Sequence, residues 1–223
     1  MRTFSFICIA LLLVFAGCKK EDTKTPFVGF TSPANFPPPT YGFTGNTVTE
    51  PGFLLGKKLF YDGRLSRDGS ISCASCHISF SAFSHVDHSV SHGIDDRLGT
   101  RNAPAVQNMA WERFFFWDGG VFDLDLFSIN PIQNHDEMDD TIPNVIAKLK
   151  ADPEYVRQFK AAFGTEEVTP TRMFQALSQF MCMLVSNDSK YDKVLKGTAS
   201  FTSAESLGKT KKKKKCASCH SGI

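Results

Sequence analysis

The sequence carries no large excess of charge of either sign. Its 25 basic and 23 acidic residues leave a formal net charge of +2. Six of the lysines lie in one short stretch, at Lys209 and Lys211–Lys215, and without those six the balance would fall from +2 to −4. The rest of the chain is therefore mildly acidic, which argues against a nucleic-acid partner.

Long hydrophobic runs are also absent. The apolar run from Phe4 to Ala16 is too short to span a membrane comfortably, and with Arg2 before it the run fits a secretory signal. It ends in the letters FAGC, which resemble a bacterial lipobox with Cys18 as the lipidated residue. Residues 1–18 are thus predicted to be a lipoprotein signal peptide, with an ordinary signal peptide as the alternative. We expect an exported protein held on the periplasmic side of a membrane through a lipid on Cys18.

Tyrosine and tryptophan are scarce, with four and two residues against 21 phenylalanines. The hydrophobic content of 42% is enough for a packed core and excludes global disorder. A core rich in Phe can surround a large flat apolar group, although it also suits an ordinary core. No stretch shows the alternation that would predict a β-sheet.

Helical patterns account for most of the chain. Residues 51–62 predict one helix, and later helices are expected from a cap at Thr141, between Asp152 and Gly164, and from Thr169 onward. The fold class is therefore mostly α. Residues 19–47 predict a flexible tether, and residues 78–110, rich in Ser, Gly and His, predict a long functional loop.

Seven cysteines divide into two groups. Cys8 belongs to the signal, Cys18 is the lipid candidate, and Cys182 lies in an apolar helix where a buried thiol is expected. The other four form two identical CASCH units, at 73–77 and at 216–220.

The C-x-x-C-H spacing is the signature of c-type haem attachment. Two thiols on one helical turn can bond both vinyl groups of a haem, and the following His can bind the iron. A disulfide, a four-cysteine zinc site and a thioredoxin-like pair are the alternatives. Zinc pairs usually lie closer in sequence than these two units, and a redox pair does not need the His.

The second CASCH differs from the first in what precedes it. A helical LGKKLF with Leu59 and Phe60 precedes the first unit, whereas LGKTKKKKK without such apolar residues precedes the second. We therefore expect the second haem unit to be incomplete in this chain. A sequence or frame error near position 209 would explain the lysine run.

Several stretches together resemble the bacterial di-haem cytochrome c peroxidase family: LGKKLFYDGRLSRDGSISCASCH, SHGIDDRLGTRNAPAVQN, FFFWDGG, NPIQNHDEM and SKYDKVLKG. The resemblance covers roughly residues 50–223. It implies a cytochrome c-like peroxidatic domain at 48–198 and the start of a second such domain at 199–223. It also implies reduction of hydrogen peroxide to water with electrons from a small c-type cytochrome or cupredoxin, and it leaves a homodimer open.

The resemblance also implies the haem ligands. Cys73 and Cys76 would hold the first haem c, with His77 as its proximal ligand and His92 as its distal ligand in the resting state. Cys216, Cys219 and His220 would begin the site of a second haem c. His85 and His88 have no role in the family pattern and are expected to face solvent.

Four further residues have family counterparts. Glu137 matches a distal carboxylate that moves a proton during peroxide cleavage, with a surface acid as the alternative. Trp117 matches the tryptophan between the two haems, and Asn102 matches a ligand of a calcium ion between the domains. Phe127 stands where many relatives carry a glutamine in the distal pocket, a difference that predicts altered handling of peroxide.

Three other functions stay open. An electron-transfer cytochrome would keep His92 on the iron and show no peroxidase activity. A di-haem oxidase on the same scaffold would oxidise protein or organic substrates. An inactive fragment is the third alternative.

Overall fold

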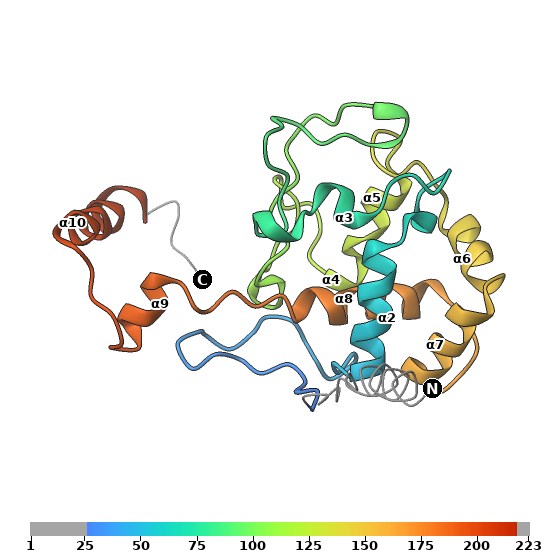
Figure 1. Ribbon diagram of the computed structural model, residues 1–223, viewed down its shortest axis with the longest axis horizontal. Helices are drawn as coiled ribbons and strands as arrows, with labels where there is room; N and C mark the ends of the chain where they lie inside the picture. The colour runs from blue at the N-terminus through green and yellow to red at the C-terminus, as the bar shows by residue number, and fades with distance from the viewer. Residues whose placement is uncertain (1–25, 218–223) are drawn as a thin grey trace, which may run out of the picture.

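The computed structural model describes residues 26–217 and is helical (Figure 1). No β-strand occurs among these residues, only three isolated bridges. The helices are α2 (Glu50–Tyr61), α3 (Cys73–Cys76), α4 (Leu124–Phe127), α5 (Ile129–Gln133), α6 (Ile142–Lys150), α7 (Pro153–Phe163), α8 (Pro170–Cys182), α9 (Lys190–Leu195) and α10 (Ser203–Lys211). The predicted mostly α class is confirmed.

The predicted helix starts are confirmed by their caps. The side chains of Thr49, Thr141, Asp152 and Thr169 each accept a hydrogen bond from a backbone N–H of the first turn that follows. A proline stands in each of those first turns, where its missing N–H costs nothing. At its other end, α7 stops at Gly164, whose φ of 75° is the left-handed conformation that glycine adopts readily.

The core forms where α2 crosses α8 (Figure 1). A Cβ atom on Gly56 would overlap the backbone carbonyl of Ala176, and one on Gly52 would overlap the side chain of Gln179. The two helices can therefore touch backbone to backbone only because these positions are glycine. Leu59 and Phe60, on the same helix, are fully buried.

The end of α2 is tied to α7 by polar contacts. The buried Tyr155 donates a hydrogen bond from its hydroxyl to Asp62 Oδ2 at 2.6 Å. Arg64 pairs with Asp152, the N-cap of α7. These contacts hold the start of the loop that leads to α3.

Residues 26–47 contain no helix, yet their aromatic side chains pack on the core. Phe30 and Phe36 lie 5.5 and 4.8 Å from the ring of the buried Trp111. Buried Asn46 accepts a hydrogen bond from Gln179 Nε2 at 2.7 Å. This part of the expected tether therefore contacts the folded body.

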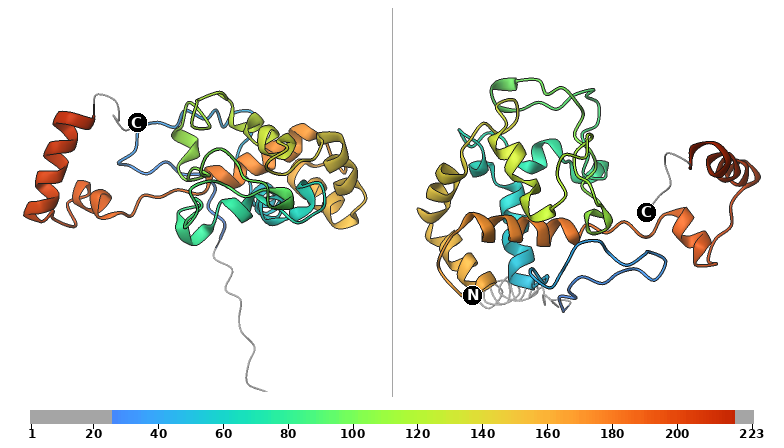
Figure 2. Two further views of the ribbon diagram at one scale, coloured as in Figure 1. Left: turned by 90° about the horizontal axis from the view of Figure 1, so that it is seen from above. Right: turned by 180° about the vertical axis from the view of Figure 1, so that it is seen from behind.

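Helices α9 and α10 lie away from the main helical body (Figure 2). Lys190 pairs with Glu205 at 2.6 Å, and the rings of Tyr191 and Phe201 lie 6.0 Å apart, so the two helices contact each other. No residue of α10 is buried. Within residues 26–217, no helix is long and apolar enough to cross a membrane.

Several sequence predictions lie outside the described residues. They are the signal peptide, the lipid on Cys18, and the second-haem residues Cys219 and His220.

Replacing Gly56 by Ala should weaken the α2–α8 contact, because the added methyl group meets backbone that cannot rotate away. Overpacking of this kind costs about 1–3 kcal/mol of unfolding free energy. Gly208→Ala is the matched control, since Gly208 is also helical and has open space around it. Denaturant unfolding should show a lower midpoint for the first variant and no loss for the second; equal midpoints would contradict the packing argument.

Candidate functional site

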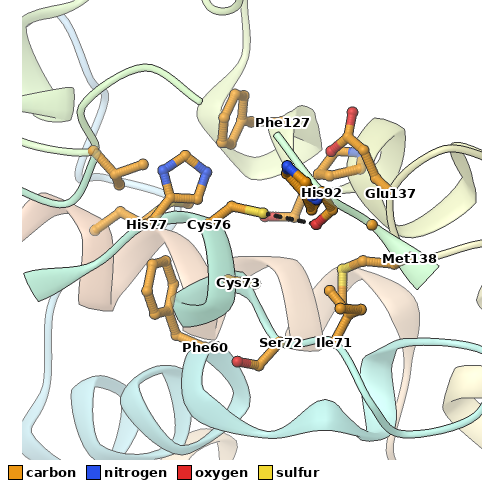
Figure 3. Close-up of a pocket in the computed structure, with 15 residues that line it drawn as sticks. Phe60, Ile71, Ser72, Cys73, Cys76, His77, His92, Phe127, Glu137 and Met138 are labelled. Carbon is orange, nitrogen blue, oxygen red and sulfur yellow. Dashed lines mark hydrogen bonds between the residues drawn. The ribbon is translucent and has the colours of Figure 1, made fainter. Parts of the chain in front are cut away.

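A cavity of about 510 Å³, measured with its open mouth, lies between α3 and the loops around residues 92 and 137 (Figure 3). Its walls are mostly apolar. The lining residues are Phe60, Ile71, Ser72, Cys73, Cys76, His77, His92, Gly93, Val106, Phe127, Ser128, Pro131, Glu137, Met138 and Met181.

The single turn of α3 places two thiols on this cavity. Ser72 starts the turn, with its backbone N–H donating to Ser75 Oγ at 3.0 Å, and His77 N–H closes it on Cys73 O at 2.9 Å. Cys73 and Cys76 are free thiols that both line the cavity. Burial raises the pKa of the Cys73 thiol to about 12 and also raises the pKa of Cys76. Thiols in such an apolar setting suit a covalent bond to carbon better than a thiolate–metal site.

His77 has a defined orientation. Its Nδ1 lies 3.0 Å from Phe83 O and 3.1 Å from Pro104 O. Because both neighbours are carbonyl oxygens, Nδ1 must carry the proton, which leaves the Nε2 lone pair free to bind a metal. Burial lowers the pKa of His77 and so favours the neutral ring that a metal requires.

His92 and Glu137 lie on the other side of the cavity from His77 (Figure 3). His92 Nδ1 is 2.8 Å from Asp96 Oδ1, and the carbonyl of His92 accepts a weak hydrogen bond from Cys76 Sγ at 3.5 Å. The His92 loop and the Glu137 turn are in backbone contact, because Ile94 N–H donates to Glu137 O at 2.8 Å.

The Glu137 carboxyl is suited to proton transfer. Burial raises its pKa, and its Oε1 accepts a hydrogen bond from Asn134 Nδ2 at 2.7 Å. The second oxygen has no partner among the described residues. A carboxyl group whose pKa is raised by burial holds its proton more readily than an exposed carboxyl group and can still release it, as proton transfer requires.

A wider and more polar hollow adjoins the cavity. It encloses about 1320 Å³, including space open to solvent, and shares Cys76, His77, Phe127, Pro131 and Glu137 with the cavity. Trp117 and Asn102 line this hollow, and Trp117 Nε1 donates to Asn102 O at 2.7 Å.

The structure thus brings five of the predicted site residues to one cavity: Cys73, Cys76, His77, His92 and Glu137. Trp117 and Asn102 lie at the adjoining hollow. Phe127 lines both spaces and is apolar where many relatives are expected to carry a glutamine. Cys216 is exposed at the end of the described residues.

Two features were missed from the sequence. Asn134 was not selected, although its position three residues before Glu137 in an NHDE turn could have indicated a hydrogen bond. His88 is exposed, as expected, but His85 is half-buried, with its ring 4.6 Å from that of His88. The ring of His88 in turn lies 4.7 Å from that of His92. The expectation that both rings face solvent was wrong for the half-buried His85.

Calcium binding by Asn102 stays a prediction. Asn102 Nδ2 donates to His85 O at 3.0 Å and braces that loop. Between residues 26 and 217, no group of three or more His, Cys, Asp or Glu side chains is arranged to hold a metal ion.

The residues present fit a covalently bound haem. Two desolvated thiols, an imidazole with a free Nε2 and an apolar cavity rich in Phe and Met meet at one place. Haem needs these same elements: attachment to carbon, one axial nitrogen and low polarity around the ring.

A comparison with protein families matches residues 50–200 to the di-haem cytochrome c peroxidase family. The methylamine utilization protein MauG of Methylorubrum extorquens is 34% identical over 219 residues, which cover 96% of this chain and 60% of that protein. The cytochrome c551 peroxidase of Pseudomonas aeruginosa is 37% identical over 184 residues, covering 80% of this chain and 53% of that protein.

Solved structures agree. The crystal structure of a MauG-like protein associated with microbial copper homeostasis superposes with a TM-score of 0.76 at 34% identity, covering 86% of this chain and 57% of that one. The chain belongs to the di-haem cytochrome c peroxidase family, and it spans about half to three fifths of the length of these relatives.

Replacing Cys73 and Cys76 together by Ser should abolish covalent haem attachment at α3, because serine oxygen does not form the thioether bond. The mass of the denatured protein, expressed with a c-type haem maturation system, should fall by one haem. Cys182→Ser is the control, since Cys182 is buried in α8 and does not line the cavity. An unchanged mass in the double variant would place the attachment elsewhere.

Proposed function

We propose that this chain forms the peroxidatic half of a di-haem cytochrome c peroxidase, which reduces hydrogen peroxide to water. One observation carries the proposal: His77 and Glu137 line opposite sides of one cavity, beside the two thiols of CASCH (Figure 3). An imidazole that would hold the haem iron on one side and a carboxyl group that would transfer a proton on the other suit peroxide cleavage.

The chain's own residues would have the following roles in the reaction. Haem, held by Cys73, Cys76 and His77, supplies the iron and the redox equivalents when bound. Asn134 fixes Oε1 of Glu137, so that Oε2 is the oxygen left to take a proton from peroxide and return it to the departing water. Phe127 and the apolar walls exclude bulk water and strengthen these polar contacts.

His92 would act as the gate. Its side chain lines the cavity on the side away from His77, and there it would hold the haem iron in the resting state (Figure 3). Peroxide would need the same position, so His92 would have to move away from it during turnover. Asp96 Oδ1, 2.8 Å from His92 Nδ1, fixes the tautomer that presents Nε2 to the metal.

Electrons would arrive through a second haem and Trp117. The exposed indole lies beside the hollow that adjoins the cavity, where it can contact a further domain. We propose a small c-type cytochrome or cupredoxin as donor, a second haem c begun by Cys216, Cys219 and His220, and an exported lipoprotein anchored through Cys18. Calcium at Asn102 and a homodimer belong to the same proposal.

A second candidate function is oxidation of a protein or organic substrate on this scaffold. Its support is the 34% identity to a MauG protein over nearly the whole chain, together with the large polar hollow beside the cavity. Turnover of peroxide with a reduced cytochrome, compared with peroxide-driven oxidation of an added substrate, separates the two functions. Lack of peroxide binding to the reduced protein would favour an electron-transfer cytochrome instead.

Replacing Glu137 by Gln should lower peroxide turnover by roughly 10²- to 10⁴-fold, the usual contribution of a positioned proton-transfer group. Haem content and the visible spectrum should stay unchanged. Glu112→Gln is the control, because burial also raises the pKa of Glu112 but it lies outside the cavity. Full activity in the Glu137 variant would refute its role.

The pH dependence of turnover should report the raised pKa of Glu137. The carboxylate is the form that accepts the peroxide proton, so kcat/KM should fall as pH drops through a midpoint above 4.5, the ordinary value for a glutamate. The Asn134 hydrogen bond lowers that pKa, so Asn134→Ala should move the midpoint to higher pH. A midpoint that is the same in wild type and in Asn134→Ala would assign the titration to another group.

A further inference from the structure

Four charged side chains join the two loops on the distal side of the cavity. Asp95, next to the His92 gate, accepts hydrogen bonds from Arg67 and Arg97 at 2.6 and 2.8 Å. Asp139, next to Glu137, accepts hydrogen bonds from the same two arginines, again at 2.6 and 2.8 Å. Each arginine thus contacts both loops, and we call these four residues the ion-pair square.

Backbone contacts run alongside the ion-pair square. Arg67 N–H donates to Met138 O at 2.9 Å, and Arg97 Nη1 also donates to His135 O at 2.8 Å. A Cβ atom on Gly93 would overlap Asp136 O and crowd Glu137, so the two loops touch here with no room for a side chain. The two loops are therefore in direct contact through backbone as well as side-chain atoms.

The two acidic members hold an uncommon backbone conformation. Asp95 and Asp139 have φ values of 54° and 50°, in the left-handed region that residues other than glycine seldom occupy. Asp96, the partner of His92, has a φ of 57°. Such conformations persist where surrounding contacts support them, and the two arginines supply contacts of this kind to Asp95 and Asp139.

We propose that Arg67 and Arg97 are positioning residues that couple the His92 gate to Glu137. The ion-pair square holds both loops in the arrangement in which His92 lines the cavity. His92 leaves the cavity only when these ion pairs loosen. The proposal rests on the proposed function for the roles of His92 and Glu137; the ion-pair square itself touches neither the cavity nor a substrate.

The ion pairs of the square are strong enough to hold the two loops together but weak enough to break when the loops move. Arg97 and Asp139 keep 26% and 21% of their side-chain surface exposed, so water and salt screen them in part. Each arginine bridges the two carboxylates through its two terminal nitrogens, and a network of four charges is worth more than an isolated surface pair.

The experiment uses the haem-loaded full chain and measures hydrogen–deuterium exchange. In Arg97→Gln, peptides covering residues 91–99 and 134–140 should both exchange faster, by roughly three- to fivefold, the change that loss of an exposed ion pair implies. Arg67→Gln should give the same pattern. Arg172→Gln is the control, since Arg172 is also 26% exposed, pairs with Glu167 and lies on α8.

The resting-state spectrum of the oxidised haem gives the second readout. Loosening the gate should raise the five-coordinate, high-spin fraction at the expense of the bis-imidazole form in both arginine variants. Arg97→Lys, which keeps the charge but not the two-pronged contact, should lie between wild type and Arg97→Gln.

The outcomes are distinct. Faster exchange confined to residues 91–99, with residues 134–140 and the spectrum unchanged, would overturn the coupling. Unchanged exchange in peptides from α2 and α8 would show that the Arg67 and Arg97 variants are folded. If these peptides also exchange faster in Arg97→Gln, the comparison of wild type with Arg97→Lys is used in its place. The exchange readout does not depend on peroxide, so failure of the peroxidase assay with coupled loops would reject the proposed function and leave the coupling intact.

Discussion

The backbone contact between α2 and α8 is the constraint on which the site depends. Gly56 lies against the carbonyl of Ala176, so the distance between the two helices is set by backbone atoms and not by adjustable side chains. Phe60 at the end of α2 and Met181 near the end of α8 both line the cavity. The positions of Phe60 and Met181 in the cavity wall therefore depend on this helix crossing. The hydrogen bond from Tyr155 to Asp62 fixes the direction in which the chain leaves α2 toward α3.

The two sides of the cavity are held by different kinds of interaction. On the proximal side, His77 is held by the backbone carbonyls of Phe83 and Pro104, and a backbone carbonyl cannot change its charge or rotate independently. On the distal side, His92 and Glu137 are held mainly by side chains, Asp96 and Asn134. Side-chain contacts break at lower cost than packed backbone, so any motion needed for turnover is expected on the distal side.

Local signals predicted the helices well, and they predicted that Cys73, Cys76 and His77 lie together. Caps such as Thr141 and Thr169 act within one turn, and CASCH places Cys73, Cys76 and His77 by helical geometry alone. The contact between Ile94 and Glu137 could not be read in this way, because it joins loops without periodicity that lie far apart in the chain. Residues 26–47 looked like a tether because Pro and Gly hide the spacing of the aromatic residues that pack on Trp111.

Both candidate functions require a small reactant to enter the inner cavity. They differ in the reductant, which would be bound outside that cavity. The apolar inner cavity, narrowed by Phe127, admits a small reactant, whereas the wider hollow beside it is lined by polar groups and is open to solvent. Under either proposed function a larger reductant would remain in or beyond the hollow, beside Trp117, a residue that is 63% exposed. Phe127 offers no hydrogen bond in the inner cavity, so under the proposed function the orientation of peroxide would depend on Glu137 and its partner Asn134.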